Sequence, residues 1–432
     1  MFGKSYKVFS VTPIVLVILL IPFSLHSNIQ ENNNDLTLNA VLLKVLGGNP
    51  DLAALRYEVK SKDGRIYQQS RLANPEFEFE LENFAGGGEL SGFGRSEYTA
   101  LLSQEIPTGN KRSLSVRIAK VEKTISELML NKKVADLLLE AKIKFYELCF
   151  LQEKIALKKK QTSQIENFKL QILKRVRAGK TSLLELSRIK IYLLRCKTDL
   201  KSAVSEFYST GLYLASLWGE DTFSYQSVIA GYSEWEKFII SDEMNKISDL
   251  NPDLAVLKKE IKQHEVELRL EKAIRIPDIS ISGGIKRHSE TGLTAFTAGI
   301  SIPVPIFDTN KGGVSTAGYL VDKAAAELKS EVLRIRSELT AKFRILITEL
   351  ENTKIYKDEI IPESEKTLMI ISEAYAMGRS DYLDVIDVYD SVYEINEEYI
   401  RSIRDRRIEL AEIERLNGRI LNITVNRSEN EK

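Results

Sequence analysis

The chain has 432 residues, enough for two or three ordinary domains, and its 61 basic and 61 acidic side chains cancel to a net charge of zero. This balance gives no electrostatic reason to expect a nucleic-acid partner. Only ten prolines and 23 glycines interrupt the chain, which favours long helices.

The N-terminus has the pattern of a secretory signal peptide. Lys4 and Lys7 precede the apolar run 8–23, and small residues that suit cleavage follow at 24–27. The alternative is a single membrane anchor, but the run is short for a spanning helix and contains two prolines. No cysteine near the cleavage site offers a lipid anchor. We therefore expect residues 1–27 to be removed on export to the periplasm, the outer membrane or the exterior.

The mature chain reads as two copies of one unit. The segment Asn49-Pro50-Asp51-Leu52-Ala53 recurs as Asn251-Pro252-Asp253-Leu254-Ala255. Two later matches, Pro75 with Pro277 and Gly179 with Gly378, are separated by nearly the same number of residues. Internal self-similarity determines architecture before any local motif does. We predict four segments after the signal peptide: a first repeat over 28–218, an inter-repeat segment over 219–248, a second repeat over 249–421 and a polar C-terminal tail over 422–432.

Each copy is predicted to begin with a helix. Asparagine followed by proline is a typical helix start, because proline is tolerated in the first turn. Apolar residues then keep a helical spacing as far as Leu72 in the first copy and Ile274 in the second. Pro75 and Pro277 should stop these helices.

The period then changes from helical to strand-like. Residues 76–82 alternate between glutamates and apolar side chains, a glycine-rich loop follows over 86–94, and a second alternating run covers 98–105. The second copy has matching runs over 279–282 and 296–302. Each copy is thus expected to hold one hairpin of strands about nine to eleven residues long, the length that crosses an outer membrane. A soluble hairpin on a core remains the alternative, because the signal of each strand is weak.

Very long helices are predicted next. No proline or glycine interrupts 111–178, which is roughly 100 Å of helix, and the chain turns at Gly179 and returns through 184–217. The second copy runs over 314–376, turns at Gly378 and returns from Tyr382 to about Leu421, with Pro362 expected to bend the first of these helices or break it. Such lengths are typical of coiled-coil packing.

The two cysteines, Cys149 and Cys196, fall on helices that pair antiparallel around Gly179. Their distances from that turn differ by many residues, so their levels differ by roughly 20 Å, far beyond disulfide reach. We expect two buried free thiols. Between the copies, 219–248 is rich in aromatic residues and is expected to form a small mixed segment on the outside of the helices rather than a plain linker.

Four strands cannot close a barrel, and open edges are not tolerated in lipid. Two chains would give eight strands, whose interior is filled by side chains, whereas three chains give twelve and leave room for a channel. The sequence therefore predicts an α+β membrane protein. Three chains, with four strands each, form a twelve-stranded transmembrane β-barrel whose helices continue as a long tube, and the carboxylates of 76–82 line water.

The chain resembles the TolC-like outer-membrane efflux protein family. The resemblance rests on the order of the repeated Asn-Pro-Asp-Leu, the segments 102–112 and 301–308, and a motif around the second turn. That motif runs Tyr375-x-x-Gly378-x5-Asp384-Val385-x-Asp387. The segment 102–112 is most similar to the heavy-metal cation branch, the CzcC type, in which a glycine usually stands at the place of Asn110.

This resemblance implies a homotrimer in the outer membrane of a Gram-negative-type cell, with a periplasmic helical barrel. A periplasmic adaptor and an inner-membrane pump, of the RND type, would be its partners. It implies no catalysis and no cofactor, because the pump supplies the energy. The two helical turns, at Gly179 and Gly378, would form the periplasmic tip that docks the adaptor.

The resemblance also assigns candidate gate residues. Two aspartates after the second turn ring the pore in the family, and they map onto Asp384 and Asp387, which share a helix face. Three copies would place six carboxylates around an opening that attracts cations. The alternative is a solvated face, because Asp381 and Asp390 continue the spacing.

The first copy differs at these positions. It has Glu185 and Arg188 at the matching offsets, which could pair with each other between three chains and leave the gate to the second copy. Tyr375 and Arg379 flank the second turn. In the family, a tyrosine stands at the position of Tyr375 and an arginine stands one position after that of Arg379. Both take part in bonds that hold the tip closed.

No enzyme or metal site is expected, because His264 and His288 lie far apart and no His/Cys cluster has ligand spacing. The cargo of such a channel stays open between metal cations and other small toxic molecules, including drugs. Two other functions also stay open. One is the outer-membrane component of type I protein secretion, and the other is an exported coiled-coil protein that conducts nothing.

Overall fold

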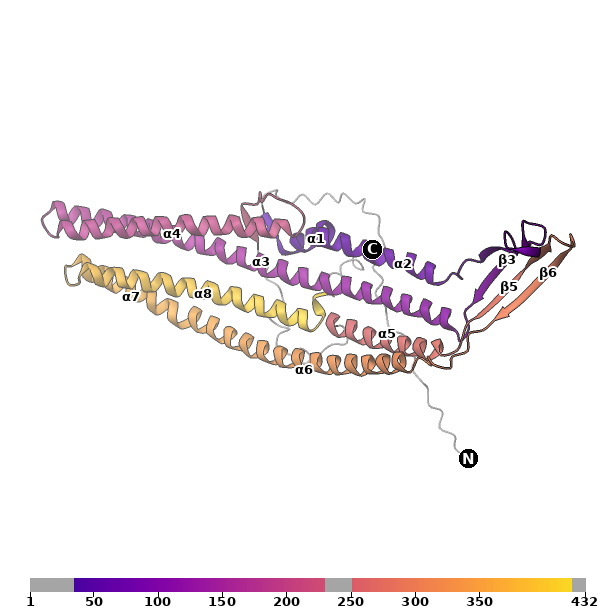
Figure 1. Ribbon diagram of the computed structural model, residues 1–432. Coiled ribbons are helices and arrows are strands. Elements are labelled where there is room, and N and C mark those ends of the chain that lie inside the picture. The colour runs from indigo at the N-terminus through magenta and orange to yellow at the C-terminus, as the bar shows by residue number, and fades with distance from the viewer. Residues whose placement is uncertain (1–34, 230–250, 422–432) are drawn as a thin grey trace, which may run out of the picture.

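The computed structural model describes residues 35–229 and 251–421 and shows a long rod (Figure 1). A β-sheet forms one end, two helix-to-helix turns form the other, and long helices run between them. The predicted signal peptide and C-terminal tail lie outside the described residues, as does most of the inter-repeat segment.

The two halves contain the same succession of elements: a short helix, a hairpin, a long helix, a turn and a returning helix. In the first half these are α2 (Pro50–Gln69), β2 (Glu76–Glu82), β3 (Glu97–Ile106), α3 (Lys111–Arg177) and α4 (Leu183–Ser216). In the second they are α5 (Pro252–Ile274), β5 (Ile279–His288), β6 (Thr294–Ser301), α6 (Lys311–Ile355) with α7 (Ile361–Ala376), and α8 (Tyr382–Leu416). Outside this scheme, α1 (Leu38–Gly48) follows β1 (Asp35–Thr37), which pairs in parallel with β4 (Ser227–Ile229).

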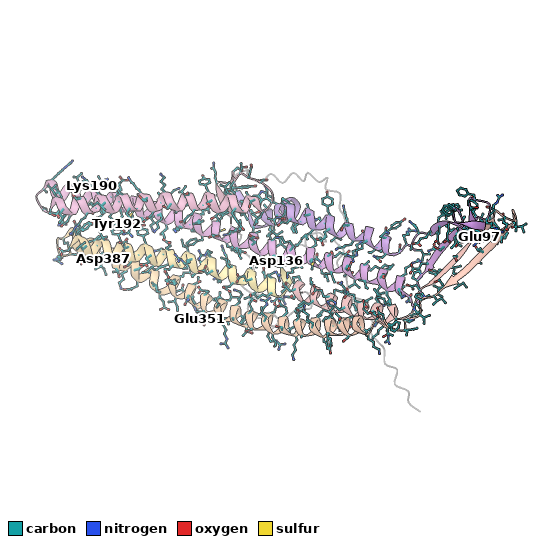
Figure 2. All side chains as sticks on the ribbon, in the orientation of Figure 1. Glu97, Asp136, Lys190, Tyr192, Glu351 and Asp387 are labelled. Carbon is teal, nitrogen blue, oxygen red and sulfur yellow. The ribbon has the colours of Figure 1, made fainter. Side chains whose placement is uncertain are left out.

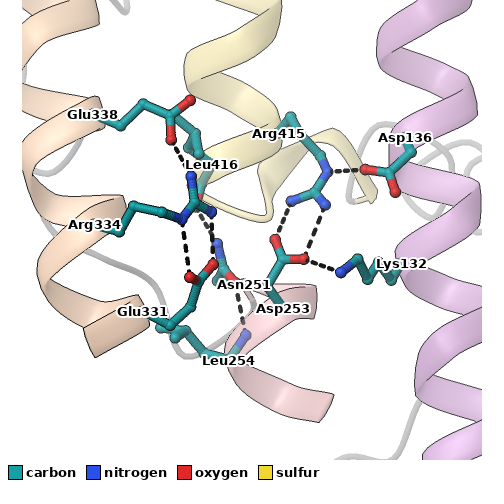
Figure 3. Close-up of polar contacts among 10 residues, drawn as sticks. All are labelled: Lys132, Asp136, Asn251, Asp253, Leu254, Glu331, Arg334, Glu338, Arg415 and Leu416. Carbon is teal, nitrogen blue, oxygen red and sulfur yellow. Dashed lines mark hydrogen bonds and ion pairs between the residues drawn. The ribbon is translucent and has the colours of Figure 1, made fainter. Parts of the chain in front are cut away.

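The repeated asparagine makes the same contacts in both halves. The side-chain oxygen of Asn49 accepts the N–H of Leu52 at 3.0 Å and caps α2, while its amide donates to the Leu217 carbonyl at 2.8 Å. Asn251 likewise caps α5 and donates to the carbonyl of Leu416 at 2.7 Å (Figure 3). Each asparagine therefore satisfies an orphan amide at a helix start and an orphan carbonyl near the end of the returning helix. This double role explains why the motif recurs.

The helices end largely where the sequence predicts, with one correction. α2 stops at Gln69, and Ser70 is its C-cap, with the Ser70 hydroxyl donating to the Tyr67 carbonyl at 2.6 Å. Leu72, expected on the helical stripe, therefore lies beyond the helix and is 47% exposed. In the second half a π-helical segment at Tyr356–Ile360 separates α6 from α7 directly before Pro362, which confirms the expected break.

The core lies along the helix contacts, in three clusters. The largest surrounds Phe145, Leu148 and Trp218 where α1, α3 and the end of α4 meet, a second lies near the turns around Phe168, and a third joins α6 to α8. Trp218 is buried, and Phe223 and Tyr225 pack beside it, so the start of the aromatic segment covers helices as expected. The other aromatic residues of that segment lie outside the described residues.

Both cysteines are buried and free, as predicted. Burial raises the pKa of Cys149 to about 12, so this thiol stays protonated and unreactive near neutral pH. Within the described ranges, no helix combines the length and the apolar character needed to cross a bilayer.

Candidate functional site

The four long strands form one antiparallel sheet in the order β2-β3-β5-β6. The two hairpins join through β3 and β5, which pair from Glu97 opposite His288 to Ile106 opposite Ile279. β3 and β5 have ten residues each, within the expected nine to eleven. β2 and β6 are shorter, with seven and eight. β2 ends because Asn83 adopts a left-handed conformation with φ of 54°, and β6 ends shortly before Pro303.

One face of this sheet is apolar. Directly paired residues of an antiparallel ladder point to the same side, so the register defines the two faces. The apolar face contains Phe77, Phe79, Leu81, Tyr98, Ala100, Leu102, Ile281, Ile285, Phe296, Ala298 and Ile300. Three polar residues towards the strand ends, Gln104, Arg287 and Thr294, share this face. Nothing in the described chain covers it, since Phe296 is 91% and Ile300 73% exposed.

The opposite face is polar. It contains Glu76, Glu78, Glu80, Glu82, Glu97, Thr99, Ser103, Ser282, Lys286, His288, Thr297 and Ser301. Lys286 pairs with Glu82 at 3.2 Å and with Glu97 at 2.5 Å, so charges of three strands meet on this side. The alternation predicted from the sequence is confirmed in the main and extends across all four strands, with Leu101 and Ala295 as apolar members of the polar face.

The sheet is open at both sides. In the described chain β2 pairs only with β3 and β6 only with β5, so each outer strand leaves one row of backbone N–H and C=O groups unpaired. An exposed edge next to an apolar face is a template for pairing with another strand.

The opposite end of the rod holds the two predicted turns. Gly179 and Gly378 both adopt left-handed φ values, 69° and 75°, which glycine reaches without strain. The backbone bonds match: Lys180 N–H donates to Arg175 and Arg379 N–H to Ala374, each across the turn. Both turns are therefore the same helix-ending motif, which explains the repeated glycine.

A hydrogen bond links the two helical hairpins at this tip. The Tyr375 hydroxyl, at the end of α7, donates to Glu185 Oε2, at the start of α4, at 3.1 Å. Arg175 donates to the Tyr375 carbonyl at 2.5 Å and lies 4.6 Å from the ring centre, and Phe168 packs edge-on against the same ring. Burial, then the negative charge of Glu185, raises the pKa of Tyr375 to about 12, while Arg175 opposes the shift. Both Tyr375 and Glu185 were candidates, but their contact was not foreseen.

The candidate aspartates lie on the exposed side of α8. Asp384 accepts the N–H of Asp381 at 3.1 Å and the Ser380 hydroxyl at 3.2 Å, so it forms a capping box at the start of the helix. Asp387, labelled near the tip in Figure 2, is exposed one turn further on. Asp390 accepts the hydroxyl of Tyr192, from α4, at 2.5 Å. Among these aspartates, Asp387 is therefore the one whose carboxylate makes no hydrogen bond or ion pair with the described residues.

The two candidate arginines are also exposed. Arg188, on α4, forms no salt bridge with Glu185 inside the described chain, and the carboxylate of Glu185 accepts the Tyr375 hydroxyl. Arg379 donates its backbone N–H across the turn, and the residue is exposed.

Comparison with known proteins agrees with this geometry. Residues 244–419 match the family described as outer membrane efflux protein. The cobalt-zinc-cadmium resistance protein CzcC of Cupriavidus metallidurans is 23% identical over 390 residues, which cover 90% of this chain and 92% of that protein. The second half of the chain thus matches the outer membrane efflux protein family, and the chain as a whole is similar to CzcC. The resemblance drawn from the sequence is thus confirmed.

Solved outer-membrane proteins share the fold of this chain. The CusC structure aligns with a TM-score of 0.72 at 14% identity, covering 88% of this chain and 92% of that one. VceC from Vibrio cholerae aligns with a TM-score of 0.71 at 16% identity, covering 88% and 96%. Within residues 35–229 and 251–421, no group of three or more His, Cys, Asp and Glu side chains could hold a metal ion.

A polar cluster halfway along the rod joins the two halves of the chain (Figure 3). Arg415, near the end of α8, pairs with Asp136 of α3 at 2.6 Å and with Asp253, of the second repeated motif, at 2.7 Å. Lys132 adds a bond to Asp253 at 2.8 Å. Burial opposes ionisation of Asp253, but the bonds from Arg415 and Lys132 outweigh it and lower the pKa of this carboxyl.

Sequence reasoning missed several of these partners. Lys133, which follows Lys132 in α3, pairs with Asp51 of the first motif at 3.1 Å. Two adjacent lysines therefore bind the aspartates of the two repeated motifs. That pairing had a local signal, since both aspartates follow the same Asn-Pro. Arg175 and Tyr192 had none, because their partners lie about half a chain away.

The tip bond can be tested by removing one oxygen atom. Tyr375→Phe keeps the ring contact with Phe168 but leaves Glu185 without its donor, which is expected to weaken the contact between hairpins by about 1.5–3 kcal/mol. Amide hydrogen exchange in the two turns should become at least tenfold faster at pH 8. Because the pKa of Tyr375 is raised above 10, the wild-type protection should persist below pH 10 and fall as the pH rises towards 12.

Tyr208→Phe, at an exposed tyrosine of α4, is the control and should change nothing at the turns. Unchanged exchange in Tyr375→Phe would mean that the hydrogen bond does not hold the tip.

Proposed function

We propose that this protein is the outer-membrane exit channel of a tripartite efflux system for metal cations. Three chains would close a twelve-stranded barrel, with the apolar face towards lipid and the polar face towards a water-filled lumen. The helices would continue the channel into the periplasm. A periplasmic adaptor and an inner-membrane pump of the RND type would deliver cargo to the tip, and the chain itself would perform no catalysis.

The observation that carries the proposal is the sheet, which has one apolar and one polar face and an open edge at each side. In lipid each unpaired backbone group is costly, so the edges must pair with strands of other copies. Two copies would give eight strands with a filled interior, whereas three give twelve and a lumen. A coiled-coil protein that only bridges structures would have no use for such a sheet.

The cargo is proposed from the relatives. CzcC bears the name of a cobalt-zinc-cadmium resistance protein, and NccC of Alcaligenes xylosoxydans that of a nickel-cobalt-cadmium resistance protein. The polar face agrees in sign, because β2 presents four glutamates, Glu76 to Glu82, at alternate positions on that side. A lumen lined by carboxylates favours cations over anions.

Two measurements test the function. The first uses cells that make the pump and adaptor of a metal-cation efflux system but lack its outer-membrane component. Expression of this chain in these cells should restore tolerance to cobalt, zinc and cadmium. The purified protein should form discrete, cation-selective channels in planar bilayers. A protein that folds in the outer membrane but neither conducts nor restores tolerance would contradict the proposal.

We further propose that the second helical hairpin carries the gate, with Asp387, and beside it Asp384, forming a ring of carboxylates at the tip. Asp387→Asn is expected to reduce cation selectivity and divalent-cation block severalfold without loss of stability, since Asp387 makes no structural bond among the described residues. Asp384→Asn would also weaken the capping box, by about 1 kcal/mol.

Asp199→Asn, an exposed aspartate of α4, removes the same charge and should leave selectivity unchanged. Equal selectivity and block in wild type, Asp387→Asn and the Asp384→Asn/Asp387→Asn double variant would exclude the ring.

A further inference from the structure

We propose that a groove where the sheet meets the helices binds the headgroup of an anionic phospholipid. The groove, of about 800 Å³, lies where the end of α2, the end of β3 and the first turns of α3 come together. The inference rests on the proposed function, because it places this junction at the periplasmic surface of the outer membrane.

The lining of the groove has an apolar part and a basic part. Leu72, Ile106 and Val116 provide the apolar part, and Leu72 and Ile106 are 47% and 41% exposed. The basic part comes from α3, with Arg112, Arg117 and Lys120, and no acidic side chain lines the groove. An apolar surface next to three basic side chains complements a phospholipid, in which the acyl chains are adjacent to the phosphate.

These three cations differ from the basic residues around them. Lys111 pairs with Asp278 at 2.8 Å, Lys123 with Asp63 at 2.6 Å, and Arg65 with Glu122 at 3.1 Å. In the described part of the chain, Arg112, Arg117 and Lys120 are exposed and form no salt bridge. The charges of Arg112 and Lys120 are thus available to a ligand, while those of their neighbours are already compensated. Arg117 also attracts the carboxylate of Glu265, whose pKa is lowered chiefly by Lys262 and in smaller part by Arg269 and Arg117.

The start of α3 adds to the positive potential. Asn110, in a left-handed conformation, makes no side-chain cap, so the first amides of α3 lack that partner and the positive end of the helix dipole faces the groove. Helix N-termini bind phosphate in this way, here supported by three side-chain charges.

The register of the sheet sets the depth of the groove. Ile106 is the last residue of β3 and lies on the same side as Leu102 and Ala100, which belong to the apolar face. Lys120 follows two to three helical turns into α3, which at 1.5 Å per residue is roughly 15 Å further from the strands. The groove therefore spans the step from the lipid-facing surface to the first charged turns of the helices. Phospholipid phosphates of the periplasmic leaflet would lie at that level.

The test uses the detergent-solubilised complex and native mass spectrometry. The probe is phosphatidylglycerol, compared with phosphatidylcholine of the same acyl chains. Wild type should retain phosphatidylglycerol with at least about tenfold preference, since each basic residue near an anionic lipid contributes about fivefold. Arg112→Gln/Arg117→Gln/Lys120→Gln should remove the preference. Inorganic phosphate at the same concentration should not displace the lipid, and full displacement would overturn the lipid assignment.

The matched control is Lys159→Gln/Lys160→Gln/Lys174→Gln, three exposed lysines on the same helix, nearer the tip. It should bind like wild type. Equal phosphatidylglycerol retention in wild type and the groove variant, with the complex assembled and conducting in both, would overturn the lipid site and leave the channel proposal intact. A wild-type complex that neither assembles nor conducts would overturn both.

Discussion

Replacing Ala298 with arginine is expected to abolish the assembled complex in the outer membrane, whereas arginine at the adjacent Thr297 should leave it intact. Both residues lie in the middle of β6, but Ala298 is on the apolar face, opposite Gly283, and Thr297 on the polar face, opposite Gly284. An arginine facing lipid near the bilayer midplane costs about 2–4 kcal/mol per chain, and every copy carries it. At Thr297 the guanidinium would face water on the side of Glu78.

The measurement is gel migration of outer-membrane fractions with and without heating, which reports the folded, assembled state. Thr297→Arg is the matched control, since charge, volume and depth in the strand are nearly the same. Equal loss or equal retention of the complex in both variants would contradict the assignment of the two faces.

Removing a buried charge is expected to have the largest effect on stability. Lys142 of α3 and Glu414 of α8 pair at 2.5 Å, with side chains only 5% and 8% exposed. Lys142→Met leaves the Glu414 carboxylate buried without its partner, which should lower the free energy of unfolding by about 3–5 kcal/mol. Lys133→Met removes an exposed pair from the same helix, 39% and 67% exposed, and should cost at most about 1 kcal/mol.

Urea denaturation followed by circular dichroism measures both variants. The double variant Lys142→Met/Glu414→Leu should regain most of the lost stability, because apolar side chains then fill the site and no charge is left unpaired. If Lys142→Met unfolds at the same urea concentration as Lys133→Met, the pair does not stabilise the contact between α3 and α8.

Local patterns in the sequence predicted most of the fold. Asn-Pro marked the starts of α2 and α5, and both are capped as that pattern implies. The change from helical to alternating period located β2, and the glycines placed both turns. Each of these features depends on residues within a few positions, which is the range that a single sequence reveals. The end of α2 was missed, because the helix stops at Gln69, several residues before Pro75.

The candidate site could be predicted only in part. The spacing of Asp384 and Asp387 places both on the exposed side of α8, but it does not distinguish a carboxylate that caps the helix from one that is free. Asp381 followed by Asp384 is itself a capping pattern, so that signal was present. The contacts of Tyr375 with Glu185, Tyr192 with Asp390 and Lys142 with Glu414 had no local signal. They join residues about 190 to 270 positions apart, and only the packing of helices brings them together.

The mass of the intact complex, extracted from outer membranes and measured by native mass spectrometry, tests the central proposal most directly. The four-stranded sheet with two open edges predicts three chains, and hence twelve strands around one lumen. A complex of one, two or four chains would contradict it.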